Sequence, residues 1–330
     1  MEGRASGMRP RVTIIIPTYN RARLVGNAIQ SVLDQDYPAI DILIVDDGST
    51  DETPSVLQSF LTDPRVRSVR HETNRGVAAA KNSGLDGLPA DSTYFGILDS
   101  DDCLLMGALD TLVCAFEAAP DRYSQVFGWC RDVDSGLDTG RMTHREGIVT
   151  LDDALAGRFA GEFWQLARHD LLGGRRFEPR ATGGESSVWW AMMRDRPALL
   201  VDSVVRAYDS SGTDRVSLTR YTPEAADGRR WVYRSVLIAV GREMRIGHPR
   251  QYGLMLAELA KWSGLAGDAK QARAASRQAL RYAPSFRTLQ VWAIAWLPSG
   301  ILRRLAALRA RTANVPGSSS PEADECADRP

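Results

Sequence analysis

The chain of 330 residues, 44% of them hydrophobic, is long enough for one large domain and an additional segment. Its 41 basic residues balance 41 acidic ones, which argues against a nucleic-acid partner. The four cysteines lack Cys-x-x-Cys spacing and only four histidines are present, so no zinc site is expected.

The first 120 residues predict strands that alternate with helices. Continuous β-branched runs are typical of strands buried on both faces, and apolar residues three or four positions apart are typical of amphipathic helices. Ser49 or Thr50 is expected to cap the helix that follows the second strand. After a flexible leader at 1–11, strands are expected at 12–16, 40–45, 66–70 and from Tyr94, and further helices at 24–35 and 77–85.

This alternation predicts an α/β fold with a Rossmann-like, doubly wound and mostly parallel sheet. In such sheets, ligands bind beyond the carboxyl ends of the strands. The unusual polar groups of this region all follow expected strands, at 18–20, 46–47, 74–75 and 99–102. We therefore expect one binding site where these four segments meet.

Three carboxylates, those of Asp99, Asp101 and Asp102, follow the strand that starts at Tyr94. Carboxylates this close repel one another unless a cation or protons lie between them. Oxygen ligands suit Mg²⁺ or Mn²⁺, so a divalent metal site is expected at this turn. The alternative is a solvated acidic turn that caps a helix beginning near Leu104.

Four sequence blocks over about residues 12–120 resemble those of family 2 glycosyltransferases. The Asp-x-Asp alone is a weak signal, but four blocks in the family's order and spacing are a strong one. The resemblance implies an inverting, non-processive enzyme with a GT-A fold, whose nucleotide-sugar half is 12–120 and whose acceptor half is 121–220. The blocks are Ile-Ile-Pro-Thr-Tyr-Asn-Arg, Val-Asp-Asp-Gly-Ser-Thr-Asp-Glu-Thr, Asn-Arg-Gly-Val-Ala-Ala-Ala-Lys-Asn-Ser-Gly and Leu-Asp-Ser-Asp-Asp.

The resemblance also implies a donor site for a nucleotide-sugar, with a UDP-sugar as the expected donor. The first block packs on the base and ribose, Asp47 contacts the base, the third block lies near the diphosphate, and the Asp-x-Asp reaches ribose and metal. A packed turn aromatic at Tyr19 and a solvated lysine at Lys81 are the competing interpretations. The expected donor-binding residues are Pro17, Thr18, Tyr19, Asn20, Asp47, Arg75, Lys81, Asp99 and Ser100, and the expected metal ligands are Asp99, Asp101 and Asp102.

An inverting transfer needs a general base on the acceptor side. Relatives carry a Glu-Asp pair at the start of a helix, and 181–190 matches that place, with Ser186 where the usual Asp stands. A serine cannot accept a proton near neutral pH, so Glu185 is the expected base; the alternative is a helix N-terminal acid. Trp189 and Trp190 are expected to form an acceptor platform, with core packing as the alternative.

The remaining sequence predicts a helical appendage at 221–313 and a disordered tail at 314–330. Residues 227–231 are faintly similar to a motif of processive members but lack its Gln, so no role is assigned to them. Free cysteines and the lack of a signal-peptide pattern favour the cytoplasm.

Residues 286–311 are predicted to contact the inner face of a membrane. No segment is apolar over the length that spans a bilayer. A stripe of apolar residues flanked by arginines is instead typical of a helix lying on an anionic surface, and the alternative is an ordinary packed helix. The stripe consists of Ile301, Leu302, Leu305 and Leu308.

The leading hypothesis is metal-dependent transfer of a sugar from a nucleoside diphosphate to a polysaccharide or lipid-linked acceptor, in cell-envelope or surface glycan synthesis. The alternative is a nucleotide-sugar-binding or scaffold protein with impaired catalysis, motivated by Ser186. A receiver-like phospho-switch also has Asp residues at strand ends, but the region up to residue 220 is too large for one.

Overall fold

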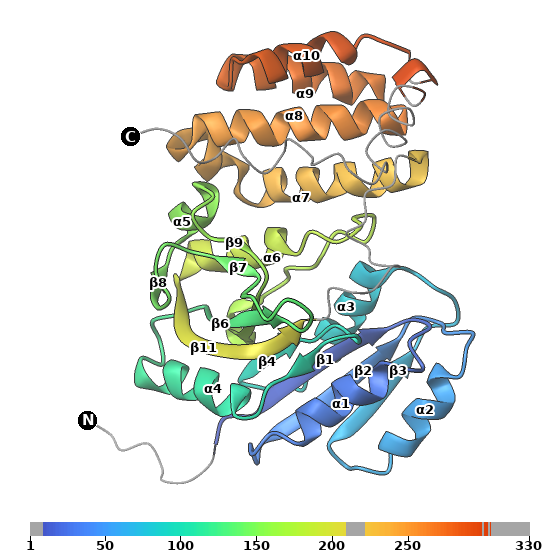
Figure 1. The fold of residues 1–330 in the computed structure, drawn as a ribbon, viewed down its shortest axis with the longest axis vertical. Coiled ribbons are helices and arrows are strands. Elements are labelled where there is room, and N and C mark those ends of the chain that lie inside the picture. Colours follow the sequence, from blue (N-terminus) through green and yellow to red (C-terminus); the bar gives the residue numbers. More distant parts are fainter. Residues whose placement is uncertain (1–8, 209–221, 299, 303, 305–330) are drawn as a thin grey trace.

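The computed structural model describes residues 9–208, 222–298, 300–302 and 304. Its main feature is a nine-stranded sheet in the order β3-β2-β1-β4-β10-β6-β11-β5, with β8 paired to β11. The first four of these strands are parallel and alternate with helices along the chain, as predicted (Figure 1). In chain order this half contains β1 (Val12–Thr18), α1 (Val25–Leu33), β2 (Ile40–Asp46), α2 (Thr53–Phe60), β3 (Val66–Arg70), α3 (Val77–Asp86) and β4 (Tyr94–Ile97).

The central parallel strands are buried on both faces because helices cover both. Every residue of β1 and β2 is buried, and successive side chains point to opposite faces. Ile14 and Ile16 pack with α1, α2 and α4 (Ala108–Ala118), whereas Ile15 packs with α3 and α6 (Ser186–Asp195). The sheet is therefore the middle of three layers, and this packing fixes the strand ends that carry the polar residues.

The second half of the sheet mixes parallel and antiparallel pairs. β10 is antiparallel to β4 and β6, whereas β11 is parallel to β6 and antiparallel to β5 and β8. A separate ribbon pairs β7 with β9 on the side of the sheet nearer α7 (Figure 1). This half contains β5 (Cys103–Leu104), β6 (Gln125–Asp132), β7 (Gly140–Arg141), β8 (Gly147–Val149), α5 (Leu151–Leu155), β9 (Ala160–Gly161), β10 (Phe163–Arg168), a 3₁₀ turn (His169–Leu171) and β11 (Ala198–Tyr208).

The helix expected near Leu104 begins later. Cys103 and Leu104 pair with β11 and form β5, so their backbone groups are used in the sheet. The helix α4 starts only at Ala108, after a left-handed residue at Gly107. The acidic turn at 99–102 is thus followed by a strand and does not cap a helix, which corrects that alternative.

The expected cap of α2 at Ser49 or Thr50 is also wrong. The helix begins at Thr53, whose backbone N–H donates to Asp51 Oδ1 at 2.9 Å. Ser49 and Thr50 bond instead to Asn20 in the turn after β1. A tertiary contact between two strand ends therefore replaces the local cap.

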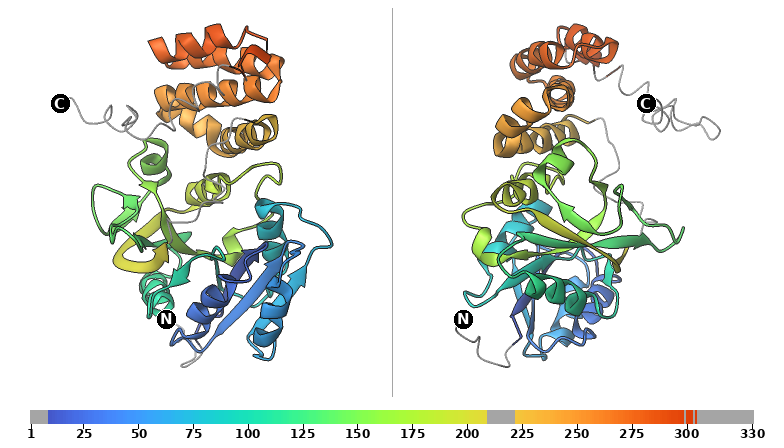
Figure 2. Two further views of the ribbon diagram at one scale, coloured as in Figure 1. Left: turned by 45° about the vertical axis from the view of Figure 1, so that its right-hand side comes forward. Right: turned by 90° about the vertical axis from the view of Figure 1, so that its left-hand side faces the viewer.

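The C-terminal region is helical, as predicted, and its helices stack in successive layers away from the sheet (Figures 1 and 2). The first of them packs on the sheet half of the molecule, where Val240 and Val236 lie against Leu155 and Trp190. The helices are α7 (Pro223–Gly247), α8 (Pro249–Ala266), α9 (Ala269–Tyr282) and α10 (Phe286–Ile294).

Within the described residues, no helix combines the length and the apolar character that crossing a bilayer requires. Several predictions fall outside these residues: most of the leader, the tail at 314–330, and the membrane-binding segment beyond Arg304, including Leu305 and Leu308.

Candidate active site

A cleft of about 1210 Å³ lies beyond the carboxyl ends of β1, β2 and β4. The segments that follow these strands meet there, as the strand order predicts. Arg75 is the one predicted site residue that does not line the cleft. The predicted residues that do line it are Pro17, Thr18, Tyr19, Asn20, Asp47, Lys81, Asp99, Ser100, Asp101, Asp102, Glu185, Trp189 and Trp190.

The turn after β1 forms one wall of the cleft. Tyr19 is 39% exposed, so part of its ring is accessible there. Asn20 adopts φ +53°, a left-handed conformation that Asn tolerates, and its Oδ1 accepts from the Thr50 N–H at 2.8 Å. Thr18 Oγ1 is buried without a hydrogen-bond partner in the structure, and such an atom beside a cleft favours a ligand group.

Asp47 ties the end of β2 to the loop before α3. Its side chain is 4% exposed, and its Oδ1 accepts from the Arg75 N–H at 2.9 Å and lies 2.6 Å from His71 Nδ1. Its Oδ2 accepts from the Gly76 N–H at 2.8 Å. His71 Nε2 lies 2.8 Å from Ser83 Oγ, which fixes the ring. Arg75 thus contributes its backbone to the site, and its side chain, expected near the diphosphate, lies outside the cleft.

Lys81 joins two sides of the cleft. Its side chain is 6% exposed, with Nζ 3.0 Å from Asp99 Oδ1 and in contact with Glu185 Oε1. Burial alone would lower the pKa of Lys81, but the charges of Asp99 and Glu185 outweigh it and raise that pKa. Burial likewise opposes ionisation of Asp99, but Lys81 and Arg206 lower its pKa. A solvated lysine at this position is therefore excluded.

Asp102, an expected metal ligand, is instead paired inside the protein. Its side chain is 3% exposed, and its Oδ2 lies 3.0 Å from Nη1 of the buried Arg206 on β11. Arg206 also reaches Glu162 Oε2 at 3.3 Å and Cys130 Sγ at 3.2 Å. Because separating a buried ion pair leaves an uncompensated charge, Asp102 is held away from a metal. This corrects the expectation: Asp102 anchors the Asp-x-Asp turn to β11.

The two remaining carboxylates of the turn fit a metal that is shared with a ligand. In the part of the chain that the structure describes, no group of three or more His, Cys, Asp or Glu side chains could hold a metal. Asp99 and Asp101 both line the cleft. Mg²⁺ is commonly held by one or two carboxylates together with phosphate oxygens, so this donor set suits Mg²⁺ or Mn²⁺ bound with a diphosphate.

Glu185 faces the Asp-x-Asp turn from the loop before α6. Gly183 and Gly184 adopt φ +79° and +82°, a region that favours glycine. A Cβ on Gly184 would come within 2.4 Å of Val232 Cγ1 on α7, so the loop is pressed closely against that helix. The Glu185 side chain remains 35% exposed. The loop thus holds a partly accessible carboxylate at the edge of the cleft.

The two tryptophans after Glu185 differ in their surroundings. Trp189 is buried, with ring centroids 6.0 Å from Phe95 and 5.7 Å from Phe177, and its Nε1 donates to Glu185 Oε2 at 3.1 Å. Trp189 is therefore a core residue that orients Glu185, and it does not form the open platform that was expected. Trp190 is half-buried and lines the cleft.

The helix α7 contributes to the cleft, which the sequence did not predict. Arg229 lines the cleft, and a Cβ on the neighbouring Gly228 would come within 1.9 Å of Thr182 Oγ1. Arg180 stacks over Trp231, 3.4 Å from the ring centroid. The helical region is thus part of the wall that carries Glu185, although 227–231 had been given no role.

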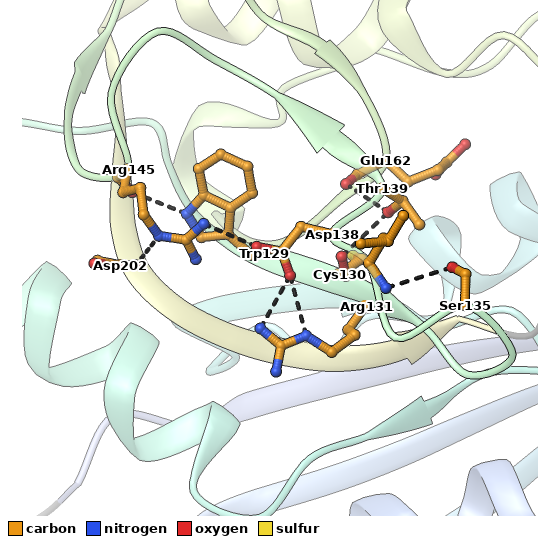
Figure 3. Close-up of polar contacts among 10 residues, drawn as sticks. Trp129, Cys130, Arg131, Ser135, Asp138, Thr139, Arg145, Glu162 and Asp202 are labelled. Atoms are coloured by element: carbon orange, nitrogen blue, oxygen red, sulfur yellow. Dashed lines mark hydrogen bonds and ion pairs between the residues drawn. The ribbon is translucent and has the colours of Figure 1, made fainter.

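A second acid, Glu162, lies at the wall formed by β6, β9 and β10. Thr139 Oγ1 donates to its carbonyl oxygen at 3.2 Å, and the adjacent Asp138 accepts from Arg131 at 3.1 Å and Arg145 at 2.8 Å (Figure 3). Burial would raise the pKa of Asp138, but these hydrogen bonds lower it. The contacts hold the hairpin after β6 in place and thereby position Glu162.

Comparison with known families identifies the chain. The sequence profile of glycosyl transferase family 2 matches residues 13–195, more than half of the chain. The chain belongs to this family. The GalNAc(5)-diNAcBac-PP-undecaprenol beta-1,3-glucosyltransferase of Campylobacter jejuni is 31% identical over 215 residues, 63% of this chain and 68% of that protein. The putative teichuronic acid biosynthesis glycosyltransferase TuaG of Bacillus subtilis is 28% identical over 194 residues, 56% of this chain and 73% of that protein.

Solved structures of other glycosyltransferases share the fold. S. aureus TarS 1-349 in complex with UDP-GlcNAc has a TM-score of 0.64 at 16% identity, with 92% of each chain covered. The mannosyltransferase PcManGT from Pyrobaculum calidifontis, in complex with GDP-Man and Mn²⁺, has a TM-score of 0.53 at 22% identity, covering 93% of this chain and 89% of that one. The predicted GT-A fold is thus confirmed.

Three residues of this family 2 glycosyltransferase escaped the sequence analysis: His71, Arg206 and Arg229. His71 could have been noticed as a histidine shortly before the Asn-Arg-Gly block. Arg206 carries no local signal, because its partner Asp102 comes from a distant segment of the chain. Arg229 lies in the 227–231 stretch that was noticed but given no role, and only the packing of α7 brings it to the cleft.

Proposed function

We propose that this protein transfers a sugar from a nucleoside diphosphate, with a UDP-sugar as the expected donor, to a hydroxyl of a polysaccharide or lipid-linked acceptor, with inversion. One observation carries the proposal: Lys81 contacts both Asp99, in the half of the cleft expected to bind the donor, and Glu185, in the loop before α6. The names of the two curated relatives refer to an undecaprenol-linked saccharide and to teichuronic acid, which supports a cell-envelope glycan as the product.

Residues 12–120 would bind the donor. Tyr19 offers a ring for stacking on the base, with Pro17, Thr18 and Asn20 around it. Asp47 Oδ2 accepts one hydrogen bond within the protein, and its second lone pair can accept from a base N–H. Asp99 and Ser100, which line the same cleft as Tyr19, would contact the ribose.

The diphosphate would lie against Lys81 and the Asp-x-Asp turn, which adjoin in the cleft. Asp99 and Asp101 are the residues that would hold Mg²⁺ or Mn²⁺, and such an ion neutralises charge on a departing diphosphate. Lys81 adds a fixed positive charge from the protein itself. Since Lys81 contacts Glu185 here, an entering diphosphate competes for the ammonium group and leaves Glu185 Oε1 available to the acceptor.

Glu185 would act as the general base. The acceptor hydroxyl oxygen forms a bond to the anomeric carbon while the bond from that carbon to the diphosphate oxygen breaks, and the hydroxyl proton passes to Glu185. Trp189 Nε1 holds the other carboxylate oxygen at 3.1 Å, which orients the group. The acceptor would bind along residues 121–220, where Trp190 provides a half-buried ring at the cleft.

A second candidate function is nucleotide-sugar binding with impaired transfer. It is favoured by Ser186, which replaces the usual Asp at the start of α6, and by the engagement of both Glu185 oxygens. Ser186→Asp separates the two candidates in a donor-turnover assay. A large gain in turnover over an inactive wild type supports the second candidate, whereas an active wild type supports the first.

The donor site is tested by calorimetric titration of UDP with Mn²⁺ and with EDTA, followed by GDP and dTDP. We expect Asp101→Asn to reduce UDP affinity in Mn²⁺ to the level in EDTA. Asp102→Asn is the matched control: it should lower the denaturation midpoint, because Arg206 loses its buried partner. Equal UDP affinity for wild type with Mn²⁺, wild type with EDTA and Asp101→Asn would contradict the metal role.

A further inference from the structure

One face of α9 carries four basic side chains, and the helix has no acidic residue. Lys270, Arg273, Arg277 and Arg281 follow helical spacing on one side, opposite the buried residues of the same helix, and Lys270, Arg277 and Arg281 are exposed. From 269 to 304 the sequence has seven basic residues and no acidic one, although the whole chain is neutral. The positive charge is therefore concentrated at this end of the molecule.

The next helix exposes apolar side chains. Phe286 is 75% exposed and Leu289 46%, while Thr288 on the opposite side of α10 is fully buried. Beyond the helix, Trp296 is 50% exposed and Leu297 37%. Large apolar residues gathered at this exposure are unusual on a soluble surface and mark a contact site.

The basic face and the apolar residues adjoin. The Arg273 guanidinium lies 4.7 Å from the centroid of the Trp296 ring, so the two surfaces share an edge. α10 forms the end of the molecule farthest from α2 (Figures 1 and 2). We call Lys270, Arg273, Arg277, Arg281, Phe286, Leu289, Trp296 and Leu297 the α9–α10 surface.

We propose that the α9–α10 surface binds an anionic lipid bilayer. Aromatic and aliphatic side chains beside arginines are the composition of interfacial helices, in which the apolar groups enter the headgroup region and the cations meet lipid phosphates. The charge fits an anionic partner, since Glu258 is already paired with Arg287 at 2.9 Å. A symmetric contact with a second copy would bring like-charged faces toward each other, which disfavours that occupant.

This inference goes beyond the proposed sugar transfer and is measured without a donor, so the two can fail separately. The full-length protein is floated with vesicles of phosphatidylcholine, or of phosphatidylcholine mixed with phosphatidylglycerol, at low and high salt. We expect binding to the anionic vesicles only, weakened by salt. Arg277→Gln with Arg281→Gln should weaken binding at least tenfold, because each basic residue near such a surface contributes about fivefold.

The control variants have the same kinds of substitution at exposed positions outside the α9–α10 surface. Arg245→Gln with Arg250→Gln removes two exposed arginines, and Ile246→Ser compares with Phe286→Ser as an apolar change. We expect Phe286→Ser to weaken flotation and both controls to leave it unchanged. The proposal is overturned if the control variants lose flotation as much as the test variants do, or if both test variants float like wild type. It is also overturned if the protein binds neutral vesicles equally well, or if the Arg277/Arg281 variant loses a dimer that wild type forms in solution.

Discussion

Two carboxylates of the Asp-x-Asp turn point to different partners, and this division decides what each can do. Asp99 shares Lys81 with Glu185, whereas Asp102 is buried against Arg206. Neighbouring acidic residues that look equivalent in the sequence thus differ in charge partner and accessibility. Substitutions at Asp99 and Asp102 are consequently expected to affect ligand binding and stability, respectively.

Replacing Glu185 with Gln should lower the rate of sugar transfer about 10²–10⁴-fold, the usual contribution of a general base. Gln keeps the shape of the side chain but cannot take the acceptor proton. UDP affinity should stay within a few-fold, because Lys81 keeps Asp99 as a partner. Both quantities are measured on one preparation. If transfer survives within a few-fold, the base lies elsewhere, and Glu162 at the opposite wall becomes the candidate.

Replacing Lys81 with Met should lower the free energy of unfolding by about 1–3 kcal/mol at pH 7, less than for a fully buried pair because both carboxylates are partly exposed. The folded-state pKa of Asp99 is below its unfolded value, so its stabilisation is present above that value and is lost as pH falls through the folded pKa. Urea denaturation should therefore show that the difference in unfolding free energy between wild type and Lys81→Met becomes smaller below about pH 4.

The control for this substitution is Lys261→Met. Lys261 pairs with Glu258 at 3.2 Å, one turn apart on α8, where both side chains are partly exposed, and such pairs contribute little. We expect a change within about 0.5 kcal/mol and no dependence on pH in the acidic range. A Lys81 variant as stable as wild type at pH 7 would show that the contacts of Lys81 do not stabilise the fold.

At the scale of elements, the sequence predicts what depends on local pattern. The buried β-branched runs identify β1 and β2, and the polar residues after them identify the cleft, because parallel strands end on one side. The start of α4, the cap of α2 and the pairing of Asp102 with Arg206 depend on contacts between distant segments. A local pattern carries no information on such contacts, so these features could not be predicted from the sequence.

The contact of α7 with the loop before α6 also depends on tertiary packing, and it can be tested. Gly228→Ala would place a methyl group 1.9 Å from Thr182 Oγ1, too close for both atoms to keep their positions. The Thr182 side chain, three residues before Glu185, must shift to admit the methyl group. We expect this shift to displace Glu185 and slow transfer at least tenfold, since about 1 Å of misplacement can cost 10²-fold. UDP affinity should be unchanged.

Gly247→Ala is the matched control on the same helix. A Cβ there meets no atom within 4 Å, so this substitution should leave transfer unchanged and alter stability by at most about 1 kcal/mol. Equal transfer rates for the two glycine variants would contradict a positioning role of α7.

For the whole molecule, the packing of α7 implies that the sheet and the helical region depend on each other. Val240 is fully buried in a cluster with Met244 and Val236 on α7 and with Leu155 and Trp190 from the sheet half. The same helix supplies Arg229 to the cleft. Ligand binding at the cleft should therefore stabilise the helical region as well as the sheet.

We expect scanning calorimetry to show a single cooperative transition that moves upward with UDP and Mn²⁺. Val240→Ala should lower the unfolding free energy by about 1–3 kcal/mol, since it removes buried methyl groups and leaves a cavity. Because that cavity lies between the two parts, the whole transition should move, whereas the exposed Ile246→Ala should leave it in place. The opposite result would be two transitions, with Val240→Ala lowering the midpoint of one and the nucleotide raising the midpoint of the other alone. That result would show that the two parts unfold independently.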